Sequence, residues 1–266
     1  MSELDRLRNA LSFLTQHLPG ATELAEIAEN GSVILDSQRQ EDADKVLTGK
    51  ADKSYNPDDF QKALDEFRKR NFSNLEIGRL YERYIGYLHE KENWQVAYTG
   101  VLGGYEDLGR DLVCIKDNEH KIIQAKCWSQ RKEVRENHVY QLYATVTHYR
   151  LQLREALYLK HGKSAGKDIM KSYKITGHLY TTTSLSEMAD KVAKHCVIEY
   201  VSEPLNKTYP MIKCNVNQKS KDKRYHLPFD PQYDSIIIGN VDGECYVNTV
   251  AEAEAKGFRR VGYVLV

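Results

Sequence analysis

The sequence predicts an α/β domain with a mixed β-sheet between residues 74 and 205. Three observations support this prediction. Segments with apolar residues three and four positions apart, the spacing of amphipathic helices, alternate with short apolar runs of strand length. Two of the short runs lie close enough in the sequence to pair as a β-hairpin. Finally, helices and strands alternate along the chain, which favours a sheet covered by helices.

The elements of this domain can be placed in order. We expect a helix at 74–92, a strand at 94–100, a glycine-rich turn at 101–109, hairpin strands at 111–116 and 121–128, a long helix at about 133–160, a strand near 175–183, a helix at 184–195 and a last strand at 197–201. The polar tetrapeptide between the two hairpin strands is the expected loop.

The flanking regions differ from this pattern. Residues 1–72 read as a helical region, with one helix stopped at Pro19-Gly20 and another begun at Asn56-Pro57. Residues 211–266 contain a small α+β module. We therefore predict three parts, at 1–72, 73–210 and 211–266. The N-terminal helices carry no recognisable chemistry, and packing or binding of a protein partner is their expected role.

Charge is distributed unevenly along the chain. The 38 basic and 38 acidic residues cancel, but residues 121–174 hold 12 Lys and Arg against 4 Asp and Glu. Phosphate binding needs a local basic patch rather than a basic protein. A solvated helix face would give the same composition, so the charge alone leaves both interpretations open.

The composition also excludes some classes of protein. No segment approaches the roughly 20 apolar residues of a membrane span, and the N-terminus does not resemble a signal peptide. Five widely spaced cysteines without a CxxC pair argue against a disulfide framework. We expect a cytoplasmic protein without membrane contact.

The hairpin carries the most informative polar residues. With the loop centred between residues 118 and 119, Asp111 is expected opposite Lys126, and Gln124 opposite Val113. Because strand side chains alternate, Asp111, Gln124 and Lys126 then share one face. Carboxylate and amide oxygens are ligands that Mg²⁺ prefers, and a lysine beside them would stabilise or orient a nucleophile. A surface Asp–Lys pair across a hairpin is the plainer alternative and contributes little.

Several ordered strings resemble one family. Gly78-Arg79-Leu80-Tyr81-Glu82, Gly109-Arg110-Asp111-Leu112-Val113 and Gln124-Ala125-Lys126 resemble those of Mrr-type restriction endonucleases, members of the PD-(D/E)xK nuclease superfamily. The resemblance continues through 138–143 and 180–205. It implies a restriction-endonuclease-like fold with a mixed β-sheet flanked by helices.

The resemblance also implies a function. It indicates a Mg²⁺-dependent DNA endonuclease, with Mn²⁺ able to substitute. By position, Asp111 is the central metal ligand, Gln124 stands where many relatives have an acid, Lys126 is the catalytic lysine, and Glu82 is an accessory acid and third ligand. We rank Asp107 below Asp111. Contacts to DNA are expected from a set of four residues after the hairpin: Arg131, Lys132, His138 and Gln141.

The sequence leaves two other functions open. Gln124 in place of an acid leaves one fewer fixed negative charge, which fits a DNA-binding module that has lost hydrolysis. A Holliday-junction-resolving nuclease would use a similar metal site and would require a symmetric homodimer. The sequence does not distinguish plain duplex, modified or branched DNA as the substrate.

Overall fold

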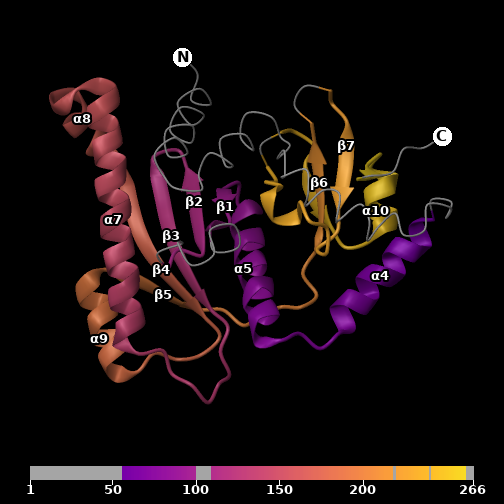
Figure 1. The fold of residues 1–266 in the computed structure, drawn as a ribbon, viewed down its shortest axis with the longest axis horizontal. Coiled ribbons are helices and arrows are strands. Elements are labelled where there is room, and N and C mark those ends of the chain that lie inside the picture. The colour runs from indigo at the N-terminus through magenta and orange to yellow at the C-terminus, as the bar shows by residue number, and fades with distance from the viewer. Residues whose placement is uncertain (1–55, 100–108, 218–219, 240, 262–266) are drawn as a thin grey trace. The chain divides into compact units, whose positions relative to one another are not determined.

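The computed structural model describes residues 56–99, 109–217, 220–239 and 241–261. The described residues form two compact units (Figure 1). The first unit comprises residues 72–206, and the second combines 56–71 with 207–261. The helix expected to end at Pro19-Gly20, the turn at 101–108 and Asp107 lie outside the described residues.

The first unit contains the predicted α/β domain. Its elements are α5 (Asn74–Glu90), β1 (Gln95–Ala97), β2 (Leu112–Lys116), β3 (Glu119–Lys126), α7 (Glu136–His161), α8 (Lys163–Met170), β4 (Lys174–Thr181), α9 (Glu187–Cys196) and β5 (Ile198–Ser202). The strands form one sheet in the order β1-β2-β3-β4-β5. The first two pairings are antiparallel and the last two are parallel. The predicted mixed sheet flanked by helices is confirmed.

The helices cover both faces of this sheet (Figure 1). α7 and α9 pack on one face, where Ile122, Leu142 and Leu179 belong to a single buried cluster. α5 lies on the other face, where the ring of its His89 packs edge-on against the ring of Tyr180 from β4, with ring centroids 5.6 Å apart. α5 begins with a reciprocal capping box at Ser73, in agreement with the expected helix start. The sheet is therefore the middle layer of three.

The hairpin register differs from the predicted one. Val113 pairs with Ile122 instead of Gln124, and Lys116 pairs with Glu119. The loop is only Asp117 and Asn118, with Asp117 in the left-handed region at φ 53°. Glu119 and His120, expected in the loop, extend β3. The shift is two residues, an even number, so it leaves the face of each side chain unchanged.

A tertiary contact explains why β3 begins early. The side chain of His120 is 1% exposed, and its Nδ1 lies 2.8 Å from the hydroxyl oxygen of Tyr149 on α7. A polar residue in a sequence of loop character is therefore a core residue, held by a partner 29 positions away. The hairpin sequence alone does not contain this information.

The second unit joins α4 (Pro57–Lys69) to the C-terminal module. The module has β6 (Ile212–Val216), β7 (Lys223–His226), a short 3₁₀ turn (Tyr233–Ser235), β8 (Cys245–Val247), α10 (Val250–Ala255) and β9 (Arg259–Arg260). Its sheet has the order β8-β6-β7-β9. α4 starts where predicted, with the side chain of Asn56 accepting from the N–H of Asp58.

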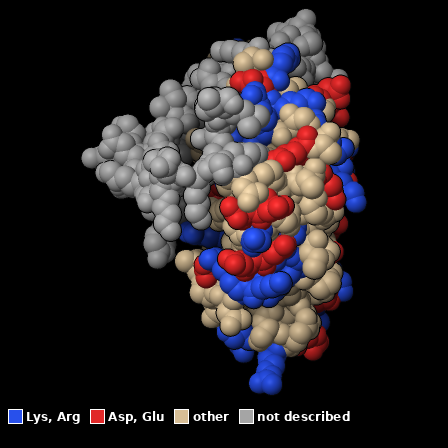
Figure 2. All heavy atoms as spheres, turned by 90° about the vertical axis from the view of Figure 1, so that its right-hand side faces the viewer, with Lys and Arg blue, Asp and Glu red and all other residues tan. Residues whose placement is uncertain are grey.

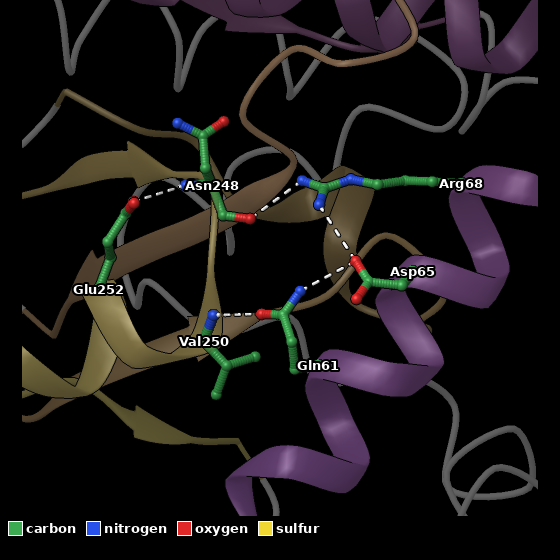
Figure 3. A network of polar contacts seen from close by, with 6 residues as sticks. All are labelled: Gln61, Asp65, Arg68, Asn248, Val250 and Glu252. Atoms are coloured by element: carbon green, nitrogen blue, oxygen red, sulfur yellow. Dashed lines mark hydrogen bonds and ion pairs between the residues drawn. The ribbon is translucent and has the colours of Figure 1, made fainter.

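Polar contacts fasten α4 to the start of α10 (Figure 3). The side chain of Gln61 accepts from the N–H of Val250 at 2.9 Å, and Arg68 donates to the carbonyl of Asn248 at 3.0 Å. Asp65 holds both side chains in place, because it accepts a hydrogen bond from Gln61 at 3.0 Å and forms an ion pair with Arg68 at 3.6 Å. α4 therefore belongs to the fold of this unit.

The surface shown in Figure 2 carries Lys and Arg side chains intermixed with Asp and Glu, without one extended basic patch. The second unit includes such mixed pairs, with Asp222 beside both Arg224 and Arg259. The basic excess of the sequence lies in segment 121–174, in the first unit, and phosphate binding is expected there. Among the described residues, no helix is long and apolar enough to span a membrane.

Two glycines of α5 give a test of the packing against β1. A Cβ at Gly86 would overlap the hydroxyl of Tyr98, whereas a Cβ at Gly78 would meet nothing within 4 Å. We expect Gly86→Ala to lower the free energy of unfolding by about 1–3 kcal/mol through overpacking. Gly78→Ala, in the same helix, should raise it by about 0.5–1 kcal/mol. Urea unfolding measures both. Equal effects of the two substitutions would contradict the packing of Tyr98 on Gly86.

Burial of His120 predicts a pH dependence of stability. Desolvation lowers the pKa of His120 from 6.5 to about 4, so the folded protein keeps this ring neutral. The unfolded chain binds the proton first as the pH falls, so the contribution is complete above about pH 6.5 and is lost between 6.5 and 4. At pH 5 we expect it to have lowered the free energy of unfolding by about 2 kcal/mol relative to pH 7.

The measurement is urea unfolding at pH 7, 6 and 5 for the wild type and His120→Gln. The substitution should reduce the loss of stability between pH 7 and 5 by about 2 kcal/mol, whatever its effect on stability at pH 7, while the buried His178 and His226, whose pKa values are also lowered, keep their contribution. Parallel curves would show that His120 is not the responsible group.

Candidate active site

Asp111 lies directly before β2 and is held against β3. Its backbone N–H donates to the carbonyl of Ile123 at 2.9 Å, and its Oδ2 accepts from the N–H of Ala125 at 2.6 Å. The residue is only 8% exposed. A hydrogen bond from a backbone N–H to a carboxylate is short and strong. It fixes the Asp111 carboxylate beside the β3 segment that contains Gln124 and Lys126.

Gln124 is fully buried on the α7 face of the sheet. Its Nε2 donates to the carbonyl of Gly109 at 3.2 Å and, at 3.4 Å, to Oε1 of Gln141 on α7. Both partners are acceptors, so the amide nitrogen must point toward them and Oε1 must point elsewhere. That Oε1 is buried and has no hydrogen-bond partner. A buried acceptor left unpaired is unfavourable by about 1–3 kcal/mol, which points to a missing donor or cation.

Lys126 is two residues further along β3 and therefore shares the face of Gln124. Its charge affects His138, near the start of α7. The pKa of His138 is lowered mainly by burial and to a smaller extent by the positive charge of Lys126. The His138 ring packs edge-on against Trp128, with ring centroids 5.0 Å apart. At neutral pH His138 is therefore uncharged beside Lys126.

The remaining predicted residues surround this group. Arg131 and Lys132 are exposed on the segment between β3 and α7. Glu82 lies on α5, half-buried, with its Oε2 shielded from solvent. The neighbouring Tyr81 donates to the carbonyl of Glu203 at 2.8 Å, just after β5. Asp111, Gln124 and Lys126 thus come together from the hairpin, whereas Glu82 comes from the helix on the opposite face.

The structure adds two positioning contacts that sequence reasoning missed. Gly109 has φ +74°, and a Cβ there would lie 2.6 Å from Nε2 of Gln141 and 3.1 Å from Nε2 of Gln124. Gln141, expected at the DNA, accepts a hydrogen bond from Gln124. The glycine-rich turn was the only sequence signal for a close approach of this kind.

The comparisons with known proteins bear on this segment of the chain. Residues 77–161, from α5 to the end of α7, match a family model described as a restriction endonuclease, the catalytic domain of the Mrr type. This segment is therefore similar to the catalytic domain of Mrr-type restriction endonucleases. The match includes Glu82, Asp111, Gln124, Lys126 and Gln141, and the surrounding fold is restriction-endonuclease-like. No significant match was found among curated proteins or solved structures.

Nucleases of this fold generally use divalent metal ions, which are held by oxygen ligands. Among the described residues, no three His, Cys, Asp or Glu side chains gather where they could hold a metal ion. Glutamine is outside that set of residue types. The buried, unpaired Oε1 of Gln124 and the carboxylate of Asp111, which accepts from the N–H of the next residue, Ala125, are both hard oxygen atoms, which fit Mg²⁺ rather than a soft metal.

Gly109 offers a test of how the site is held. We expect Gly109→Ala to lower the rate of DNA cleavage by the domain at least about tenfold, because the new methyl group displaces the amides of Gln141 and Gln124. The matched control is Gly162→Ala, since Gly162 has φ +78° but nothing within 4 Å of a Cβ. Both substitutions should destabilise the fold by about 1–3 kcal/mol through backbone strain. Cleavage rates and urea midpoints are measured for both, and similar cleavage by the two variants would contradict a positioning role.

Proposed function

We propose that the chain is a divalent-metal-dependent endodeoxyribonuclease that hydrolyses phosphodiester bonds, with Mg²⁺ as the ion and Mn²⁺ as a substitute. The nuclease domain spans residues 73–210 in this proposal. Asp111, Gln124 and Glu82 hold the metal, and Lys126 acts at the scissile phosphate. The observation that carries the proposal is the buried Oε1 of Gln124, which has no hydrogen-bond partner and precedes Ala125, whose N–H holds the carboxylate of Asp111.

The amide of Gln124 suits a ligand role because its orientation is determined. The Nε2 of Gln124 donates to the carbonyl of Gly109 and to Oε1 of Gln141, so the Oε1 of Gln124 is the atom left to bind a cation. A cation bound there would remove the penalty of an unpaired acceptor. Asp111 supplies the negative charge, and Glu82 a second carboxylate from α5. A bound divalent ion lowers the pKa of a coordinated water and offsets the charge that develops on the phosphate.

The chain's own cations complete the chemistry. Lys126 provides a positive charge on the same face as Gln124, where it stabilises the pentacoordinate phosphate. The neutral ring of His138, whose pKa burial and Lys126 lower, leaves Lys126 as the charged group at that point. Arg131 and Lys132, exposed beyond the end of β3, contact backbone phosphates, together with His138 and Gln141 near the start of α7.

A binding module without hydrolysis is the second candidate, because a neutral glutamine replaces an acid among the ligands. One carboxylate and one amide attract a cation less strongly than two carboxylates. The two functions differ in one respect only, since both bind DNA and only the nuclease breaks a bond.

The deciding experiment measures cleavage of duplex, single-stranded and four-way-junction DNA with Mg²⁺, Mn²⁺ or EDTA. We expect Asp111→Asn and Lys126→Ala each to reduce metal-dependent cleavage at least about 100-fold while DNA binding persists. Asp168→Asn and Lys116→Ala are the matched controls. Asp168 is exposed on α8, and Lys116 lies at the loop end of the same hairpin. Both should cleave at the wild-type rate.

The other outcomes are equally informative. Binding of DNA by the wild type without cleavage in either metal would favour the binding module. Preferred cutting of four-way junctions by a dimer would identify a junction-resolving enzyme. A chain that neither binds nor cuts DNA would overturn the proposal.

A further inference from the structure

The segment that carries Arg131 and Lys132 runs alongside the end of β4. The parallel pairing of β3 with β4 continues one residue past the end of β4, because the N–H of Thr182 donates to the carbonyl of Lys126 at 3.2 Å. Near its other end, the N–H of Val134 donates to the carbonyl of Ser184 at 2.9 Å. The backbone of 127–133 is thus held at both ends by the segment 182–186.

Two threonine hydroxyls hold the middle of this segment. The Oγ1 of Thr182 accepts from the N–H of Trp128 at 2.9 Å and donates to the carbonyl of Trp128 at 2.6 Å. The Oγ1 of Thr183 donates to the carbonyl of Lys132, and Nε2 of Gln130 donates to the carbonyl of Thr182. Each hydroxyl therefore takes the place of a backbone partner that an ordinary strand would provide.

The same segment presents its charged side chains outward. A turn closes it, with the N–H of Lys132 donating to the carbonyl of Ser129 at 2.9 Å. Arg131 and Lys132 are exposed at this turn, within six residues of Lys126 in the sequence. Fixing the backbone before DNA arrives lowers the conformational entropy cost of binding.

We propose that Thr182 and Thr183 are positioning residues that hold the 129–132 turn in the conformation in which Arg131 and Lys132 contact the phosphate backbone of DNA. The inference rests on the proposed function, because DNA is its ligand. The hydroxyls act through the backbone of Trp128 and Lys132 and touch no substrate. Their removal leaves the metal ligands in place and affects DNA binding through Arg131 and Lys132.

A purely structural role for the hydroxyls makes a different prediction. If they only satisfied buried backbone groups, their removal would lower stability and leave the contribution of Arg131 to DNA binding unchanged. A positioning role requires that the contributions of Thr182 and Arg131 depend on each other. A double-mutant cycle measures this dependence.

The experiment uses the full chain carrying Asp111→Asn, so that bound DNA is not cut. The dissociation constant for a duplex is measured between about 50 and 200 mM salt for Thr182→Val, Thr183→Val, Arg131→Ala and the pair Thr182→Val with Arg131→Ala. We expect each valine variant to bind about fivefold to tenfold more weakly. The logarithm of the dissociation constant should also depend less steeply on the logarithm of the salt concentration. The slope should become smaller by about 0.9 for each phosphate that the protein no longer neutralises. In the Thr182→Val protein, Arg131→Ala should have little further effect.

Two controls separate this result from general destabilisation. Thr147→Val removes an exposed hydroxyl that donates to Tyr143 within α7, and should bind DNA like the parent. Thr182→Ser keeps the hydroxyl and should restore both the affinity and the salt slope. Amide hydrogen exchange of 128–132 should be faster in Thr182→Val than in Thr182→Ser.

Each remaining outcome counts against one proposal or both. Additive effects of Thr182→Val and Arg131→Ala would overturn the positioning role and leave the nuclease proposal intact. Equal rates of amide hydrogen exchange at 128–132 in Thr182→Val and Thr182→Ser would likewise overturn the positioning role and leave the nuclease proposal intact. Failure of the Asp111→Asn parent to bind any DNA would overturn both proposals.

Discussion

The two-sided pairing of β3 is the constraint on which the rest of the first unit depends. β3 pairs in parallel with β4 from Glu119 to Lys126 and antiparallel with β2 from Glu119 to Ile123, so its backbone is fixed by β4 along its whole length and by β2 over its first part. This fixed backbone gives Gln124 and Lys126 one face and presents the N–H of Ala125 to Asp111. The threonine contacts of the 127–133 segment continue the same β3–β4 pairing beyond the sheet. A displacement of β3 would therefore affect the donor pair, the lysine and the basic turn together.

Much of this arrangement could be predicted from the sequence because it depends on periodicity. The order of helices and strands followed from apolar spacing, and the shared face of Gln124 and Lys126 followed from strand alternation. The register did not follow, because the polar residues 117–120 give no sign that Glu119 and His120 belong to a strand. Their assignment depends on Tyr149, a helix residue far along the chain. A two-residue error in register was harmless to the predicted faces, whereas an error of one residue would have separated the group.

The contacts that orient the site lay beyond sequence reasoning for another reason. Gln141 contacts Gln124 only because α7 crosses the sheet at one particular position, and Gly109 allows this contact by having no Cβ. The same holds for Thr182 and Thr183, which the sequence marks only as strand-forming residues. The contact of Gln141 depends on the distance between layers, and those of Thr182 and Thr183 depend on the path of the chain after β3. Hydrophobic periodicity determines neither. For the second unit, the attachment of α4 to α10 through Gln61 and Arg68 likewise has no local signal.

The neutral side chain at position 124 has a consequence for how the protein is made. A carboxylate buried there beside Asp111 would repel its neighbour and would strongly favour protonation or unfolding in the absence of a counter-ion. Glutamine limits the penalty to one unpaired oxygen. Under the proposed function, the chain would complete its core first and bind an ion afterwards, so that biosynthesis would not depend on the supply of metal at the moment of folding.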